Sequence, residues 1–233
     1  MKNSILILGS KPPGKIPKVE VQEVFSSNGS AELANLYIKK VKQVSHTCII
    51  GAESFTKLDH IKTRVINSEP NEIVIRDYKE IYSYIPDLFK IKLKTTKFKK
   101  KEQLMFQKIY FNKGLIDILI AELNYEEKFI NKIIHILRAS LLDNLWGVSS
   151  GFFALLYAAN KYPYSNLIVS GLSFEGGEHY YNQGKMTDNR GKVDGYLFKL
   201  LKKQIKDRIF IFDKEISKKL NVKNLVVDEI LQK

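Results

Sequence analysis

The sequence contains little cysteine and no long apolar run, and both absences limit the classes of protein to which the chain can belong. Cys48 is the single cysteine, which excludes an intramolecular disulfide, and its place in the apolar stretch TCIIG predicts a packing role. The apolar stretch near the start, SILIL, is too short for the core of a signal peptide, and no run approaches the length of a membrane span. We therefore expect a cytoplasmic protein.

Signatures of phosphate loops and metal centres are also missing. Neither G-x-G-x-x-G nor G-x-x-x-x-G-K-S/T occurs, which disfavours a dinucleotide fingerprint and a P-loop. Histidines and carboxylates do not recur at metal-ligand spacing, so we expect neither a metal nor another cofactor. Of the four histidines, only His179 lies in a glycine-flanked loop, EGGEHYY; the others are interpreted as structural residues, namely His46, His60 and His135.

Positive charge is what the chain has in excess. Its formal net charge is +13, which favours polyanions such as nucleic acid, phosphorylated substrates or an acidic membrane face. The densest lysine run, KIKLKTTKFKKKEQ, covers residues 90–103. We interpret it as a solvated connection, with peripheral contact to the inner face of an anionic membrane or to a phosphate-bearing acceptor as the alternative. Phe98 and Phe106 give only weak support for base stacking, so a nucleic-acid partner is not expected.

Short apolar runs alternate with amphipathic stretches along the chain. Buried strands are predicted at SILILGS, HTCIIGAES, EIVIRD, NLIVSGLSF and RIFIFD. The prolines of KPPGKIPK indicate neither helix nor strand there. Helical spacing occurs in SAELANLYIKKVK, residues 102–142, GFFALLYAANKY and VDGYLFKLLKKQI. The alternation predicts a single α/β domain over residues 1–233, with a mostly parallel sheet flanked by helices and a helical insertion or lid at about residues 90–142.

Ligands in open parallel sheets bind beyond the carboxyl ends of the strands, and this rule selects loops before any motif is considered. The candidate loops are Gly9-Ser10, Ser27–Gly29, Gly51–Glu53 and residues 171–184. The turn Ser149–Gly151 joins them for another reason. The first amides of the helix that it opens lack internal partners and can bind an anion.

Polar residues in these segments suit a nucleotide, although each also has a structural interpretation. Asn28 can both donate and accept hydrogen bonds, so it could contact a nucleotide. The alternative is that it is an ordinary turn residue before Gly29. The hydroxyls of Ser149 and Ser150 suit a ribose, a phosphate or a helix cap.

The segment DNRGKVDGY, just before the late basic helix, adds charged candidates. Arg190 and Lys192 are suited to neutralise phosphate, and Asp194 to orient a partner. The alternative is a charged helix entrance, in which Asp194 lies near the first turn and is stabilised by the helix dipole.

Together these segments resemble the sialyltransferase-type glycosyltransferases of bacteria and animals, which use CMP-activated sugars. ILILGSKPP is similar to the family's first strand and glycine loop, and EVFSSNGSAE to the segment with an asparagine that faces the nucleotide. VSSGFFALLYAAN followed by NLIVSGLSF resembles the family's small-residue turn, helix, strand and glycine, and EHYY resembles the His-aromatic motif of the animal-type enzymes. The likeness covers about residues 3–35 and 145–200.

The resemblance implies a Rossmann-like fold of the glycosyltransferase-A-variant type. It also implies metal-independent, inverting transfer of an acidic sugar (sialic acid, Kdo or a related one) from a CMP-sugar to a glycan or lipopolysaccharide-type acceptor, as in cell-surface polysaccharide synthesis. The residues that we expect to bind the nucleotide on this basis are Gly9, Ser10, Asn28, Ser149, Ser150, Gly151, Gly171 and Phe174. We expect the leaving phosphate to be contacted by Tyr180, Tyr181 and Arg190. The residues expected to take part in catalysis are His179, Lys192 and Asp194.

One departure from the family pattern bears on activity. The family places a catalytic histidine just before its late helix, whereas DNRGKVDG contains none. Asparagine and arginine cannot act as bases near neutral pH, and a lysine does so only where its pKa is strongly lowered. We therefore expect His179 to supply the base, or the chain to be an inactive relative. Two readings outside this family stay open: a non-catalytic polyanion-binding protein, and an α/β enzyme that uses a UDP or GDP sugar.

Overall fold

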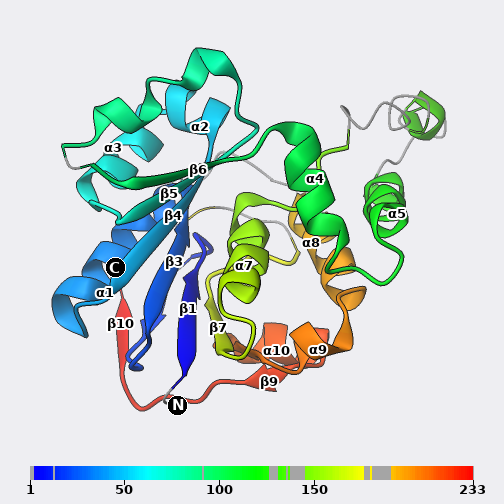
Figure 1. Cartoon of the computed structure of the whole chain (residues 1–233). Coiled ribbons are helices and arrows are strands. Elements are labelled where there is room, and N and C mark those ends of the chain that lie inside the picture. Colours follow the sequence, from blue (N-terminus) through cyan, green and yellow to red (C-terminus); the bar gives the residue numbers. More distant parts are fainter. Residues whose placement is uncertain are drawn as a thin grey trace.

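The computed structural model describes residues 3–12, 14–90, 92–125, 131–134, 136, 145–175, 179 and 190–232. Its centre is an eight-stranded sheet in the order β6-β5-β4-β3-β1-β7-β8-β9, in which every neighbouring pair is parallel (Figure 1). This confirms the predicted α/β class. The strands are β1 Ser4–Leu8, β3 Glu23–Ser27, β4 Ser45–Gly51, β5 Glu72–Arg76, β6 Lys94–Lys97, β7 Asn166–Ser170, β8 Ile209–Ile211 and β9 Lys223–Asn224.

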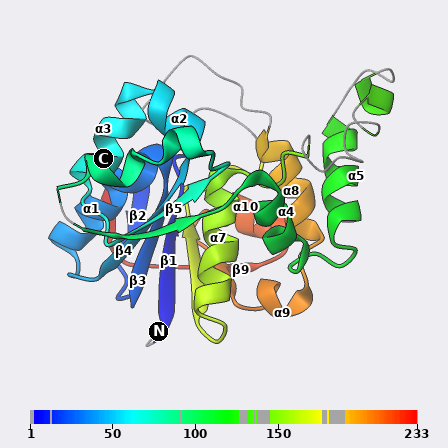
Figure 2. The ribbon, with the colours of Figure 1, turned by 45° about the horizontal axis from the view of Figure 1, so that its top comes forward.

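Helices cover both faces of the sheet, because successive residues of a strand point to opposite sides. Ile5 and Ile7 of β1 enter one apolar cluster with α7, whereas Leu6 and Leu8 enter another with α1. Figure 2 shows α7 and α8 on one side of the sheet and α1 to α3 on the other. The helices are α1 Ala31–Lys40, α2 Ala52–Lys57, α3 Asp59–Asn67, α4 Lys100–Lys108, α5 Leu115–Tyr125, α7 Ser150–Lys161, α8 Arg190–Lys199, α9 Lys203–Lys206 and α10 Lys214–Leu220, with 3₁₀ turns at Asn28–Ser30, Glu80–Tyr82 and Ile85–Leu88.

The strand order places a topological switch point beside β1. From β1 the chain steps outward through β3, β4 and β5 to β6. It then returns through α4, α5 and α7 and adds β7 on the other side of β1. The connections that leave β1 and β7 lead to opposite halves of the sheet. In such sheets ligands bind in the region outside the carboxyl ends of these two strands, which is here called the crevice.

Two segments differ from the sequence-based expectation. The proline segment does contain a strand, β2 Lys15–Pro17, which pairs antiparallel with β10 Ile230–Gln232. A short two-stranded ribbon tolerates Pro17 because this residue ends the strand, where a missing amide donor costs little. The lysine run contains β6 at the sheet edge, where lysines discourage pairing with another chain, so the segment expected to be a helical insertion begins as an edge strand.

The late basic helix is interrupted where one continuous helix was predicted. It ends as α8 at Lys199 and resumes as α9 at Lys203. Between them the backbone bonds to the loop after α4: the amide of Lys202 donates to the carbonyl of Tyr110 at 3.0 Å. This long-range bond replaces an intrahelical one and breaks the helix.

Candidate functional site

The crevice at the carboxyl edge of the sheet brings together loops that the sequence selected. Asn28, just after β3, has a left-handed backbone (φ 47°), and its Oδ1 accepts a hydrogen bond of 3.1 Å from the amide of Gly51, the last residue of β4. A Cβ built on Gly51 would lie 3.9 Å from Oγ of Ser150 at the start of α7. Asn28 and Ser150 therefore meet at one strand end, as a shared nucleotide site requires.

The turn that opens α7 lies over the ends of β3 and β7. A Cβ built on Gly151 would lie 3.5 Å from Oγ of Ser27 and 2.6 Å from Cδ2 of Leu172. The side chain of Ser149 caps the helix by accepting a hydrogen bond of 3.2 Å from an amide of the first turn. The amides of Ser150 and Gly151 precede the first intrahelical bonds and are suited to receive an anion.

The glycine loops after β1 and β7 touch each other. The amide of Gly9 donates to the carbonyl of Ser170 at 2.8 Å. A Cβ built on Gly9 would lie 2.1 Å from the carbonyl oxygen of Gly171, which no real side chain could occupy. Gly171 has φ 72°, a conformation that favours glycine. The two predicted loop glycines thus close the floor of the crevice.

His179 lies beside Ser10 at this crevice, although 169 positions separate them in the chain. Ser10 Oγ and His179 Nδ1 form a hydrogen bond, which engages one ring nitrogen. Ser10 lies just beyond the end of β1, so the predicted base and the predicted nucleotide loop share one site. The expected phosphate contacts lie outside the described residues, namely Tyr180, Tyr181 and the side chain of Arg190.

The two α8 residues expected in catalysis lie in different surroundings. Asp194 is buried, and its Oδ1 accepts a hydrogen bond of 3.0 Å from the amide of Ser149, so the carboxylate orients the turn that opens α7. Lys192 is exposed. The alternative interpretation of Asp194 as a charge at the helix entrance is wrong, because it lies beyond the first turn of α8, which contains no acidic residue.

Phe174, expected at the nucleotide, is a core residue instead. Its buried ring packs edge-on against Phe152 and Phe198, with ring centroids 6.0 and 5.0 Å away. A Cβ built on Gly195 of α8 would lie 2.2 Å from the carbonyl oxygen of Phe174, so α8 packs directly on this loop. The packing of α8 thus turns the ring into the core, and a role of Phe174 in nucleotide binding stays a prediction.

Arg76, the last residue of β5, is a site residue that the sequence reasoning missed. Arg76 is 2% exposed, and its guanidinium donates to Oγ of Ser150 at 3.3 Å and to the carbonyl of Val148 at 2.8 Å. It also lies 4.7 Å from the ring centroid of Phe153. Because a guanidinium stays protonated, it brings a fixed positive charge to the start of α7. The available signal was EIVIRD, in which a charge ends an apolar strand at the ligand-binding edge.

Buried polar side chains from α4 and α5 hold the backbone just before α7. Oε1 of Glu122 accepts hydrogen bonds from the amides of Trp146 at 2.7 Å and Gly147 at 2.8 Å. Oε1 of Gln107 accepts one from the amide of Val148 at 2.9 Å. With the bond from α8, side-chain oxygens bind four consecutive amides. The turn is thereby held in one conformation, which positions the amides that follow before any ligand arrives.

The same turn reads GVSSG and matches G-x-S-x-G, the pattern of a nucleophile elbow; the sequence reasoning took this pattern to be absent, which is wrong. An elbow places its serine on a strained turn between a strand and a helix. Here residues 145–148, which lead into the turn, are not a strand. Ser149 has an ordinary extended backbone (φ −60°, ψ 167°), and its hydroxyl caps α7. The structure therefore gives Ser149 the setting of a helix cap.

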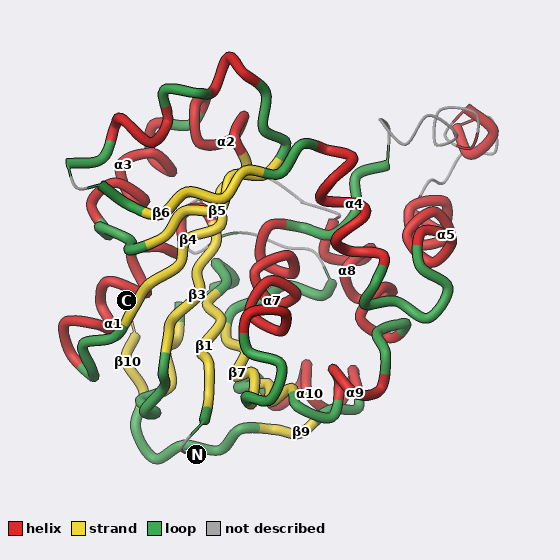
Figure 3. Tube along the Cα trace, in the orientation of Figure 1, coloured by secondary structure: helices red, strands yellow, loops and turns green. Residues whose placement is uncertain are grey.

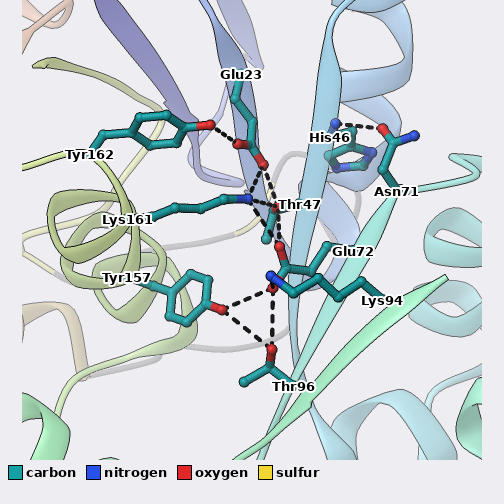
Figure 4. A network of polar contacts seen from close by, with 10 residues as sticks. All are labelled: Glu23, His46, Thr47, Asn71, Glu72, Lys94, Thr96, Tyr157, Lys161 and Tyr162. Atoms are coloured by element: carbon teal, nitrogen blue, oxygen red, sulfur yellow. Dashed lines mark hydrogen bonds and ion pairs between the residues drawn. The ribbon is translucent and has the colours of Figure 1, made fainter.

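A second polar cluster lies at the opposite, amino-terminal edge of the sheet (Figure 4). Nζ of Lys161, the last residue of α7, pairs with Glu23 at 2.9 Å and Glu72 at 3.0 Å, the first residues of β3 and β5. Thr47 of β4 donates to Glu23 at 2.5 Å, and Tyr157 donates to Glu72 at 2.9 Å. The cluster therefore ties the end of α7 to three strands.

Charges in this cluster compensate one another. Burial alone would raise the pKa of Glu72, but hydrogen bonds from Lys161 and Tyr157 bring that pKa below its usual value. Burial would lower the pKa of Lys161, and the two glutamates raise it instead. Burial, together with a hydrogen bond to Glu23, raises the pKa of Tyr162 to about 12. The cluster is therefore an anchor of paired charges at the amino-terminal edge.

Among the described residues, no three His, Cys, Asp or Glu side chains are placed to hold a metal ion together. No helix in that part of the chain is long and apolar enough to cross a bilayer. Comparison of the chain with protein-family models, curated proteins and solved structures found no match.

Proposed function

We propose that the chain is a glycosyltransferase that transfers an acidic sugar from a CMP-linked donor to a glycan acceptor, with inversion at the anomeric carbon. One observation carries the proposal: Asn28 and Ser150 both lie against Gly51 at the carboxyl edge of the sheet. The hydrogen-bonded pair Ser10 and His179 lies at the same edge. Only β3 separates β1 from β4, so the two groups lie about 10 Å apart across the edge. That spacing suits a nucleotide at one end and a reacting sugar at the other. The choice of CMP rests on the sequence resemblance.

The donor phosphate is assigned to the start of α7. The amides of Ser150 and Gly151 and the positive end of the helix dipole favour an anion there. Arg76 adds a fixed charge through its bond to Ser150. When the sugar departs, the phosphate of CMP gains negative charge, which these prepositioned groups stabilise. The side-chain amide of Asn28 lines the same strand end and suits a hydrogen bond to the nucleotide.

The transferred proton is assigned to His179. The acceptor hydroxyl oxygen forms a bond to the anomeric carbon, and the bond from that carbon to the phosphate oxygen breaks, so that CMP leaves with the electron pair. The hydroxyl proton passes to Nε2 of His179. Ser10 engages Nδ1 and so fixes the orientation of the ring. A well-placed base contributes roughly 10²–10⁴-fold to the rate.

Calorimetric titration of the chain with CMP tests the donor site. We expect wild type to bind, and Ser150→Ala and Asn28→Gly each to lose about tenfold in affinity, since each removes one polar contact. Glycine is chosen at position 28 because it keeps the left-handed backbone. Ser45→Ala, at an exposed serine that begins β4, is the matched control and should bind as wild type does. Absence of heat with CMP, or an equal loss in the control, contradicts the proposal.

UDP and GDP, titrated in parallel, separate the choice of nucleotide from the existence of the site. Binding of UDP or GDP in place of CMP, with the same dependence on Ser150, would keep the site and replace the donor. Binding of nucleic acid with a steep salt dependence, and of none of the nucleotides, would favour a non-catalytic polyanion-binding protein.

A further inference from the structure

A cavity of about 840 Å³ lies where α9 and the end of α10 meet the start of β9. Its volume is within the range of small-molecule sites. Two of its lining residues lie at strand starts: Asp207 lies two positions before β8, and Lys223 begins β9. Figure 3 shows α9, α10 and β9 at the end of the sheet that carries the N-terminus. The cavity is therefore separate from the crevice at the carboxyl edge.

The lining of this cavity is strongly basic. Its lining residues include one carboxylate, that of Asp207, and five lysines: Lys199, Lys203, Lys206, Lys219 and Lys223. We call it the lysine cavity. An ammonium group carries only donors, so the lining suits an anion. The lining residues, all of them within the described chain, include no aromatic side chain on which a nucleobase could stack.

Backbone contacts orient two of these ammonium groups. Nζ of Lys206 donates to the carbonyl of Lys199 at the end of α8, and Nζ of Lys223 donates to the carbonyl of Asp207 at 3.0 Å. Each ammonium has three donors, so two remain for a ligand. Burial lowers the pKa of Lys206, which means that its charge is partly desolvated. An anion in the cavity would relieve that cost.

Helix ends explain only part of the arrangement. Lys199 and Lys206 close α8 and α9, where the helix dipole favours cations, and Lys219 also pairs with Glu175 on the surface. Lys203 begins α9, where the dipole disfavours a cation, and Lys223 lies in a strand. Like charges repel, and an anion in the cavity would offset the repulsion among these lysines.

We propose that the lysine cavity binds a compact anion that carries several closely spaced phosphate groups and no nucleobase. The phosphates belong either to a free polyphosphorylated molecule or to a lipid headgroup. Lysines act as separate point charges and lack the planar fork with which arginine grips one carboxylate, so five of them suit several phosphates around one cavity.

Titration of the full chain with inorganic tripolyphosphate near physiological salt tests the inference. We expect wild type to bind, and Lys199→Gln/Lys203→Gln, which removes two exposed ammonium groups, to lose about tenfold or more in affinity. Lys39→Gln/Lys40→Gln, at the exposed end of α1, is the matched control with the same loss of charge and should bind as wild type does. Thermal unfolding of both variants checks that they fold.

Vesicles separate the two sources of phosphate. Co-sedimentation with phosphatidylcholine vesicles that contain phosphatidylinositol bisphosphate, but not with phosphatidylcholine alone, and its loss in the cavity variant, would assign a lipid headgroup. Tripolyphosphate binding without vesicle binding would assign a free ligand. Absence of binding to both probes, or an equal loss in the α1 control, overturns the inference. The cavity variant should still bind CMP, so this inference and the proposed function fail independently.

Discussion

Acid should destabilise the chain through His46 in β4. The imidazole is fully buried, and its Nε2 forms a hydrogen bond of 2.8 Å with Oγ of Ser26. Burial lowers the pKa of His46 from 6.5 to about 4, because a charged ring cannot be solvated at this position. Between these two pH values the unfolded chain binds a proton on His46 and the folded chain does not. The free energy of unfolding therefore falls as the pH falls.

The size of this effect follows from the two pKa values. A change from 6.5 to about 4 corresponds to about 3 kcal/mol of stability, which is fully present above pH 6.5 and lost by about pH 4. Urea unfolding across this pH range measures it, with His46→Gln as the comparison, because glutamine does not titrate and keeps a polar group near Ser26. Carboxylates such as Glu72 titrate in both proteins, so the difference between the two profiles isolates His46. Parallel profiles would refute the reasoning.

Three further substitutions test the anchor, the floor of the crevice and the base. Lys161→Met should lower the free energy of unfolding by about 3–5 kcal/mol, because two buried glutamates lose their shared cation; a loss near zero in urea unfolding would show that the cluster is no anchor. Gly9→Ala should cost about 3 kcal/mol, since its Cβ would meet the carbonyl of Gly171, whereas Gly51→Ala meets only ordinary contacts and should keep the wild-type melting temperature. Equal melting temperatures for the two would contradict the close approach. His179→Ala should keep CMP binding and lower kcat with a CMP-sugar donor by roughly 10²–10⁴-fold, and an unchanged kcat would remove it from the mechanism.

Continuous apolar runs made most of the sheet predictable. A strand with helices on both faces needs apolar residues at successive positions, which is why SILIL and EIVI indicated β1 and β5. Cys48 shows the same logic, since it is fully buried within β4 as a packing residue. In each case the local sequence contains the information that the fold uses.

Strands defined by distant partners were not predictable in this way. β6, KTTK, contains no apolar residue, and its backbone is extended because it pairs with β5. β2 contains a proline and pairs with β10 at the other end of the chain. Neither pairing leaves a periodic pattern in the sequence, because β2 has only three residues and β6 only four.

The grouping of the candidate site residues at one sheet edge was predictable, whereas their contacts were not. The ends of parallel strands share one edge of the sheet, which is why the sequence placed Asn28, Ser150 and Ser10 in one region. The contact of Arg76 with Ser150 depends on how α7 packs on β5, and the ring of Phe174 turns inward because α8 packs on its loop. Such contacts join segments that are far apart in the chain, and single-sequence patterns do not encode them.

An NMR titration of the isotope-labelled chain with CMP tests the central claim most directly. The account predicts that the amide signals of Ser10, Gly51 and Ser150 shift together along one saturation curve, while that of Lys203 in the lysine cavity stays in place. Shifts confined to the lysine cavity, or no shift at saturating CMP, would contradict it.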